Sequence, residues 1–331
     1  MGDSERSPMQ SALVRAAASL LCVLAGCALL GCSDSKKTKV AGILFQEDQF
    51  FRLVEYGMRA AAKQHDLTLL VGNSSSALDK EVSLVDTYIE RGVKAIVISP
   101  LSTKSSVPAL QRAYARGIQV ITYNTAIAAD FPASNIESDQ VDLGAATGKA
   151  ARKYIEEKLG GRAQVILIAF MAQAPEQSRL RVDGFKNEIR RLRGVTIVAE
   201  QDAWLAPKAA DRVESLLNAS PDANLVWAAN EGGTVGAVTA VRNTGKKGKV
   251  AVFGTDMSEQ LADFLLADDN ILQAVTGQKP FDIGSLAVET AVKVLKGETV
   301  EKQVSLPGVL FTRDKPDEVR AYKKFLQELT Q

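Results

Sequence analysis

Short polar side chains follow two apolar segments in the second half of the chain, and these residue types could bind a small molecule. Asn230 comes soon after the apolar run 225–228, and Asp256 comes soon after the apolar run 250–253. The segment between the runs has the pattern of a helix, so the two runs are expected to be parallel strands. Open α/β sheets bind small molecules at the carboxyl ends of their strands. We therefore expect Asn230 and Asp256 to border a binding crevice.

The same unit of strand, polar turn and helix recurs along the rest of the chain. Further apolar runs lie at 40–44, 67–71, 95–98, 119–122, 164–168, 196–199 and 271–275. Near-continuous apolar strands are typical of parallel sheets that are covered by helices on both faces. A looser segment at 126–138 divides the pattern, which restarts at Gln140. The sequence therefore predicts an α/β protein with two similar lobes in tandem.

Composition and motifs exclude several functional classes. The formal net charge is +1, so no electrostatic field favours nucleic acid. The three cysteines, Cys22, Cys27 and Cys32, all precede Ser33, which excludes a disulfide framework, a zinc site or a cysteine nucleophile in the globular part. The single histidine, His65, lies at the end of a predicted helix and is expected to face solvent. Because no nucleophile elbow, metal cluster or phosphate loop is present, we expect neither an enzyme nor a cofactor.

The N-terminal region is predicted to direct export. The apolar run 16–30 follows Arg15 and is too short for a comfortable membrane span, which is typical of a signal-peptide core. We expect a signal peptide at 1–31 and a polar tether at 32–38. Asp3 and Glu5 are unusual so early in a signal peptide, and Met9 is an alternative start.

A cysteine in this region is the expected site of lipid attachment. The residues before Cys32 resemble a bacterial lipobox, and the chain becomes polar directly after it. Cys27 has a similar context but is followed by apolar residues. We expect lipidation at Cys32, with Cys27, or signal cleavage without lipid, as alternatives.

Seven short motifs occur in one order along both predicted lobes. They are Phe50-Phe51, Ile98-Ser99-Pro100, Val120–Asn124, Arg179-x-Arg181-x-x-Gly184-Phe185, Asn230-Glu231, Gly254-Thr255-Asp256 and Gln278-x-Pro280. Together, over about 39–310, they resemble periplasmic sugar-binding proteins of the ribose- and galactose-binding type, the substrate receptors of ATP-driven importers. The resemblance implies the type I periplasmic-binding-protein fold, in which three hinge strands join two Rossmann-like lobes and the ligand lies between them.

The resemblance also implies lobe boundaries. The hinge crossings are expected near 136–139, 278–280 and 307–310. The N-terminal lobe would comprise 39–138 plus 279–307, and the C-terminal lobe would comprise 139–278 plus 308–331.

A sugar would be held by side chains from both lobes. Each sugar hydroxyl donates and accepts hydrogen bonds and needs a partner once it leaves water. The expected ligand-binding residues are Asp48, Phe50, Phe51, Ser99, Asn124, Arg179, Trp204, Asn230, Asp256 and Gln278. Asp256 would accept from neighbouring hydroxyls, Arg179 would offer its planar fork, and aromatic rings would stack on the C–H faces of the ligand.

Structural interpretations compete at several of these positions. Asp256 could cap a helix that starts near Ser258, Asn230 could form only a turn, and Arg179 could be a solvated helix residue. Trp204 could belong to the core. One of Phe50 and Phe51 is expected in the core because consecutive residues at a helix start point apart, and Arg181 is expected to be structural.

The predicted function is that of an extracytoplasmic substrate-binding lipoprotein. It would capture a small neutral sugar or polyol as a monomer anchored by lipid in the periplasm or cell envelope, and would deliver this ligand to the membrane permease of an ABC importer. Asn124-Thr125 replaces the Asp-Arg pair usual in ribose binders, so ribose itself is not expected, and another pentose, a hexose, a sugar alcohol or a cyclitol remain open. The alternative is a ligand-sensing receptor for a sensor kinase or chemoreceptor. A repressor of the lactose type is disfavoured, because a secretion signal stands where its DNA-binding domain would lie.

Overall fold

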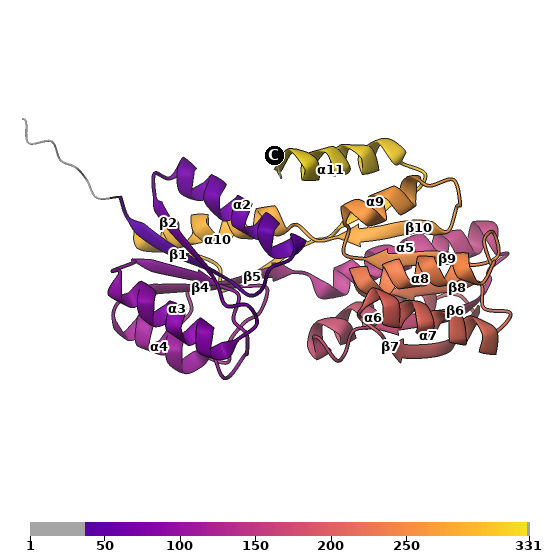
Figure 1. Cartoon of the computed structure of the whole chain (residues 1–331), viewed down its shortest axis with the longest axis horizontal. Coiled ribbons are helices and arrows are strands. Elements are labelled where there is room, and N and C mark those ends of the chain that lie inside the picture. Colours follow the sequence, from indigo (N-terminus) through magenta and orange to yellow (C-terminus); the bar gives the residue numbers. More distant parts are fainter. Residues whose placement is uncertain (1–36, 330–331) are drawn as a thin grey trace, which may run out of the picture. The chain divides into compact units, whose positions relative to one another are not determined.

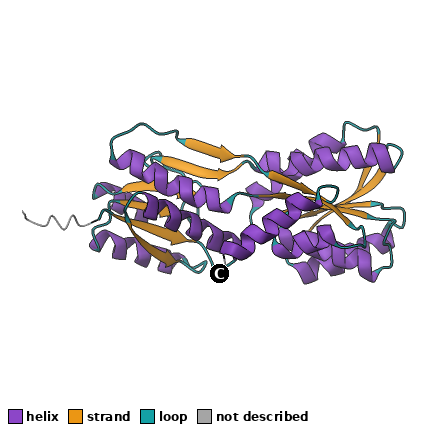
Figure 2. Cartoon of the chain, turned by 90° about the horizontal axis from the view of Figure 1, so that it is seen from above, coloured by secondary structure: helices purple, strands orange, loops and turns teal. Residues whose placement is uncertain are grey.

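The computed structural model describes residues 37–329, in which helices cover both faces of two six-stranded sheets (Figures 1 and 2). The first sheet has the order β11-β5-β4-β3-β1-β2, and all of its strands pair in parallel. Its strands are β1 (Lys39–Leu44), β2 (Thr68–Asn73), β3 (Ala95–Ile98), β4 (Gln119–Tyr123), β5 (Ser134–Ser138) and β11 (Gln303–Leu306). Its helices are α2 (Gln49–Gln64), α3 (Leu78–Glu90), α4 (Val107–Ala115) and α10 (Pro280–Leu295).

The second sheet repeats this plan. Its order is β12-β10-β9-β8-β6-β7, with only β12 antiparallel to its neighbour. Its strands are β6 (Arg162–Ala169), β7 (Gly194–Asp202), β8 (Leu225–Ala228), β9 (Ala251–Thr255), β10 (Leu272–Gly277) and β12 (Val309–Thr312). Its helices are α5 (Gln140–Lys158), α6 (Pro175–Ile189), α7 (Ala206–Ala219), α8 (Glu231–Asn243), α9 (Glu259–Leu266) and α11 (Pro316–Leu329). Each sheet with its helices is called a lobe below, and the prediction of two tandem α/β lobes is confirmed.

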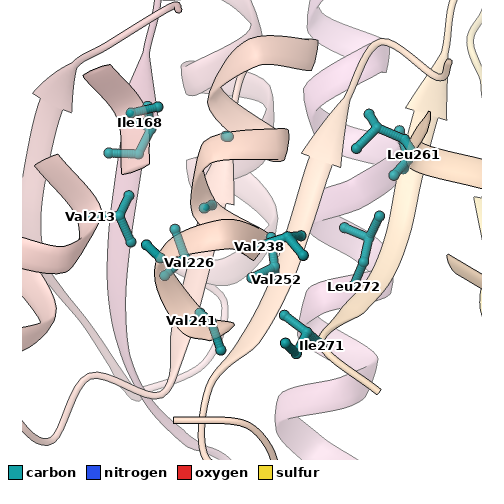
Figure 3. Close-up of a cluster of buried hydrophobic side chains, with 14 of the residues drawn as sticks. Ile168, Val213, Val226, Val238, Val241, Val252, Leu261, Ile271 and Leu272 are labelled. Carbon is teal, nitrogen blue, oxygen red and sulfur yellow. The ribbon is translucent and has the colours of Figure 1, made fainter. Parts of the chain in front are cut away.

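The central strands of each sheet are apolar because each contributes to two cores. In β3, Ala95 and Val97 pack against α2 and α10, whereas Ile96 and Ile98 pack against α3 and α4. The alternation of side chains along a strand produces this division. The second lobe follows the same rule, and Figure 3 shows the core between its sheet and the helices α7, α8 and α9.

Glycines allow helices to pack in close contact in both lobes. A Cβ atom on Gly57 of α2 would lie 2.0 Å from the carbonyl oxygen of Phe281 in α10. A Cβ atom on Gly144 of α5 would lie 1.9 Å from the carbonyl oxygen of Arg181 in α6. Only glycine allows the two backbones to approach so closely, so each pair depends on its glycine.

Within the described residues, the chain crosses between the lobes three times. The crossings follow β5, β10 and β11, at 138–140, 277–280 and 306–309. β5 lies in a segment predicted to be irregular, and β11 and β12 were not predicted either. All three are short, and β5 carries buried polar residues in place of an apolar run. β12 is a short apolar run, whereas β5 and β11 are strands because of their pairing with neighbouring strands rather than their local sequence.

The predicted signal peptide, Cys27, Cys32 and most of the tether lie outside the described residues. Between residues 37 and 329, no helix combines the length and apolar character that crossing a membrane requires.

Candidate functional site

A cavity of about 360 Å³ opens where the carboxyl ends of strands from both lobes meet. The first lobe contributes the turn after β1 and the start of α2, and the second lobe contributes the segments that follow β6, β7, β8, β9 and β10. The helix α11 adds Tyr322. The lining residues are Gln46, Asp48, Gln49, Phe50, Leu53, Phe170, Gln173, Arg181, Trp204, Leu205, Ala206, Asn230, Glu231, Gly232, Asp256, Met257, Ser258, Gln278, Pro280 and Tyr322. This volume lies within the range of small-molecule sites.

Asp256 is held in a fixed orientation at this cavity. Its Oδ2 accepts a hydrogen bond from Nη1 of Arg181 at 2.7 Å, and its Oδ1 accepts one from Nε2 of Gln278 at 2.7 Å. Its backbone has φ 69°, a left-handed conformation that aspartate tolerates better than most residues. The backbone conformation at the strand end and these two hydrogen bonds therefore fix the orientation of the carboxylate.

Arg181 is the buried cation of the cavity. Its Nε donates to Oε1 of Gln140 at 2.7 Å, and Nη1 also donates to the carbonyl oxygen of Ala229 at 2.9 Å. The guanidinium lies 5.0 Å from the ring centre of Phe170. Only 4% of the surface of Arg181 is exposed. Its hydrogen bonds to α5, to the end of β8 and to Asp256 hold its side chain in one position.

Asn230 and Glu231 begin the helix α8 at the cavity wall. Oδ1 of Asn230 accepts from the backbone N–H of Gly233 at 3.1 Å, and its Nδ2 donates to the carbonyl oxygen of Trp204 at 2.9 Å. Asn230 is therefore both a helix cap and a lining residue, so the structural interpretation also applies. Burial raises the pKa of Glu231, as do the nearby carboxylates of Asp256 and Asp48, while a hydrogen bond with Ser258 lowers it.

Tyr322 brings the C-terminal helix to the same cavity. Burial, together with the carboxylates Asp256 and Glu231, raises the pKa of its phenol to about 12. Its ring also packs against Phe311 of β12, with 4.6 Å between ring centres. The phenol therefore stays neutral and can donate or accept a hydrogen bond.

The first lobe contributes Asp48 and Phe50. Oδ1 of Asp48 accepts from the backbone N–H of Phe51 at 2.9 Å and so caps α2. Phe50 lines the cavity, whereas Phe51 is 5% exposed and packs against Phe45 and Tyr123. The expectation that one phenylalanine belongs to the core holds, and Phe51 is that residue.

Six of the ten predicted ligand-binding residues line the cavity: Asp48, Phe50, Trp204, Asn230, Asp256 and Gln278. Phe51, Ser99, Asn124 and Arg179 do not. Ser99 is fully buried, and its Oγ lies 3.4 Å from Nδ2 of Asn124. The carbonyl oxygen of Asn124 accepts from Nε2 of Gln177 at 3.3 Å, so this residue contacts the second lobe outside the cavity lining.

The prediction that Arg179 lies at the cavity is wrong, because this residue lies on the surface of α6. Its side chain is 52% exposed and pairs with Glu176 at 2.6 Å and Asp183 at 3.1 Å. Arg181, expected to be structural, occupies the cavity instead. The spacing in the sequence could have predicted the burial of Arg181. It precedes Phe185 by four residues and Ile189 by eight, and this spacing places the three residues on one buried helix face.

Several lining residues were not predicted. Gln49 follows the first strand, and Phe170 and Gln173 follow β6, so attention to every strand end would have indicated them. Tyr322 lies in a charged C-terminal helix, and no motif or strand end marks it. Between residues 37 and 329, no group of histidine, cysteine, aspartate and glutamate side chains is arranged to hold a metal ion.

Comparisons with known proteins agree with this architecture. The family described as "Periplasmic binding protein domain" matches residues 43–299. The chain is 31% identical over 303 residues to the ABC transporter periplasmic-binding protein YphF of Escherichia coli K12, which covers 89% of this chain and 91% of the relative. It is also 31% identical over 254 residues to the ribose import binding protein RbsB of the same organism, covering 76% of this chain and 82% of the relative.

Solved structures share the fold. An ABC transporter solute binding protein from Bacillus halodurans C-125, solved with bound myo-inositol, has a TM-score of 0.75 at 22% identity and covers 88% of this chain and 99% of its own. The binding component of the arabinose ABC transporter from Shewanella sp. ANA-3, bound to L-arabinofuranose, has a TM-score of 0.77 at 22% identity and covers 89% and 98%. The matched span, the identity to full-length relatives and the shared two-lobe fold lead to one conclusion: the chain belongs to the periplasmic binding protein family, whose members are exported binding proteins rather than enzymes.

Proposed function

We propose that the protein captures a sugar or sugar alcohol in the cavity between its lobes and presents it to the membrane permease of an ABC importer. The observation that carries this proposal is the cavity lining, in which a carboxylate, an amide, a guanidinium and aromatic rings converge from separate strand ends and helices. Hydroxyl-rich ligands need such a set, because each hydroxyl that leaves water requires a partner. The relatives named for ribose import and the solved structures with bound polyols support the same ligand class.

The central binding group in this proposal is Asp256. It would accept hydrogen bonds from ligand hydroxyls, while Arg181 and Gln278 hold its carboxylate in place. Asn230 would contribute the remaining hydrogen of its amide, and Phe50 and Trp204 would pack on the apolar faces of the ligand. Arg181 rather than Arg179 is therefore the arginine of the proposed site, and its role is to hold Asp256 rather than to bind ligand oxygens through a free fork.

Gln278 would couple the ligand to the hinge. It follows β10 at one crossing, and its Oε1 accepts from Oγ of Ser138 at 2.8 Å at another crossing. Its Nε2 donates to Asp256. A ligand that contacts Asp256 would therefore bias the arrangement of two hinge segments and favour a closed state, which is a population shift.

The domain organisation follows from the same proposal. The N-terminal lobe would comprise 39–138 plus 279–307, and the C-terminal lobe 139–278 plus 308–331, with the three crossings acting as the hinge. We propose further that the mature protein is a monomer anchored by lipid at Cys32.

A screen of sugars, sugar alcohols and cyclitols by thermal shift, followed by calorimetry, tests the proposal. A ligand at about one hundred times its Kd stabilises the folded state by about 2.7 kcal/mol, which is readily detected. Asp256→Ala should abolish the shift given by the best ligand, whereas Arg179→Ala, outside the cavity, should preserve it. A complete panel without binding would refute the proposed function, and retained affinity in Asp256→Ala would refute this assignment of the site.

A further inference from the structure

We propose that the ligand carries a protonated amine in addition to its hydroxyls, as amino sugars and amino polyols do. This inference rests on the proposed function, because it assumes that the cavity is the ligand site. It concerns the charge of the ligand, which the proposed function leaves open.

The cavity is lined by more acidic than basic side chains. Asp48, Glu231 and Asp256 line it together with one cation, Arg181, and no lysine or histidine is among the lining residues. Three carboxylates less one guanidinium give a formal charge of −2. Arg181 is already paired with Asp256 at 2.7 Å, so the negative charge of the other two carboxylates is uncompensated.

Glu231 is the carboxylate best placed to meet a cation. It is partly buried at the start of α8 and forms no ion pair with any described residue. Its hydrogen-bond partner is the neutral side chain of Ser258. The carboxylates of Asp256 and Asp48 act on it electrostatically and raise its pKa, in addition to the larger effect of burial. A cation bound among these three groups would relieve their mutual repulsion.

Three side-chain amides of the cavity already donate a hydrogen bond to the protein. Nδ2 of Asn230 donates to Trp204, Nε2 of Gln278 donates to Asp256, and Nε2 of Gln46 donates to Asp48. The carboxylate of Glu231 can only accept hydrogen bonds, and it has no cationic partner among the described residues. A hydroxyl group both donates and accepts, whereas an ammonium group donates three hydrogen bonds and accepts none, so an ammonium matches this unpaired carboxylate better.

The aromatic residues of the cavity favour the same ligand. Phe50, Phe170, Trp204 and Tyr322 line it together with the carboxylates. Aromatic faces attract cations through their quadrupole, and this attraction is stronger in a desolvated site. A polyol with one ammonium group would use both the apolar surface and the negative charge.

Matched pairs of ligands test the inference with the full-length protein. The probes are D-glucosamine with D-glucose, D-galactosamine with D-galactose, and an amino-inositol with the inositol of the same configuration. Calorimetry should show that at least one amine binds about tenfold or more tightly than its neutral partner. The N-acetylated form keeps the nitrogen but removes the charge, so it should lose this preference.

Variants connect the preference to the carboxylate. Glu231→Gln preserves the size of the side chain and an acceptor for Ser258, and it should reduce the amine-to-neutral affinity ratio about tenfold. Glu176→Gln is the matched control, because Glu176 also lies in the first turn of a helix but outside the cavity, and it should leave the ratio unchanged. The wild-type comparison alone remains decisive if Glu231→Gln does not fold.

The outcomes separate the two proposals. Neutral sugars that bind as tightly as their amines in every pair would overturn this inference and leave the proposed function intact. A preference for amines that Glu231→Gln does not reduce would overturn the role of Glu231. If no member of any pair binds while a neutral pentose or sugar alcohol of the wider panel does, this inference fails and the proposed function stands. A wider panel without any binding, amines included, would overturn both.

Discussion

The exchange of Arg181 for methionine should both destabilise the protein and abolish ligand binding. Methionine retains much of the apolar length of the side chain but removes the charge and all the donors. Asp256 would lose its cation, and the acceptors on Gln140 and Ala229 would lose their donors. The proposed binding site and the packing of the second lobe should therefore depend on the same guanidinium.

The magnitude follows from burial. The side chains of Arg181 and Asp256 are 5% and 25% exposed, so their ion pair is largely shielded from water. Removal of one partner of a buried pair costs about 3–5 kcal/mol. For a protein of this size, about 2–4 °C per kcal/mol gives a fall in Tm of about 6–20 °C.

Denaturation monitored by circular dichroism, with calorimetry for binding, would measure both effects. Arg179→Met is the matched control, because its exposed ion pairs should leave stability and binding as in the wild type. Adding Asp256→Asn to Arg181→Met removes the unpaired carboxylate and should recover much of the lost stability without recovering binding. A single variant Arg181→Met that is as stable as Arg179→Met would refute this reasoning.

The remaining predictions concern the helix packing, the hinge and the dependence on pH. Gly57→Ala should force α2 away from the backbone of Phe281 and lower stability by about 1–3 kcal/mol, and an unchanged denaturation midpoint would contradict this. Gln278→Ala should weaken ligand binding about tenfold, since Ser138 and Asp256 both lose a partner, and calorimetry that gives wild-type affinity would disprove the coupling. The folded pKa of Glu231 is raised by burial, so the folded state holds its proton more tightly than the unfolded state. The stability that this tighter proton binding gives to the folded state is fully present below the unfolded pKa of about 4.3, and it is lost as pH rises through the folded pKa. As pH rises through the folded pKa of Glu231, the Tm of the ligand-free wild type should therefore fall more than the Tm of Glu231→Gln. An equal fall in Tm for the two proteins would contradict this reasoning.

The cavity illustrates which site residues local sequence can indicate. Asn230 and Asp256 were predicted because they follow apolar runs, and the ends of parallel strands meet at one edge of a sheet. The helical positions were harder to predict. Arg179 and Arg181 are two residues apart and point to different sides of α6, so a small error in the helix phase exchanges their environments.

Two strands of the first sheet illustrate a similar limit. β5 and β11 have little apolar pattern of their own, and β11 pairs with β5 across a separation of well over one hundred residues. Their strand structure arises from that distant pairing. No local window of sequence contains the partner, so periodicity alone could not predict them.

The sequence by itself determined the class of fold, the two tandem lobes and several strand ends that line the cavity, because apolar periodicity and turn residues act within short segments. Tertiary structure decided which arginine pairs with Asp256, which phenylalanine enters the core and that Tyr322 reaches the cavity. These outcomes depend on contacts between segments far apart in the chain. Burial and hydrogen bonding at such contacts are properties of the assembled lobes, and no single segment contains them.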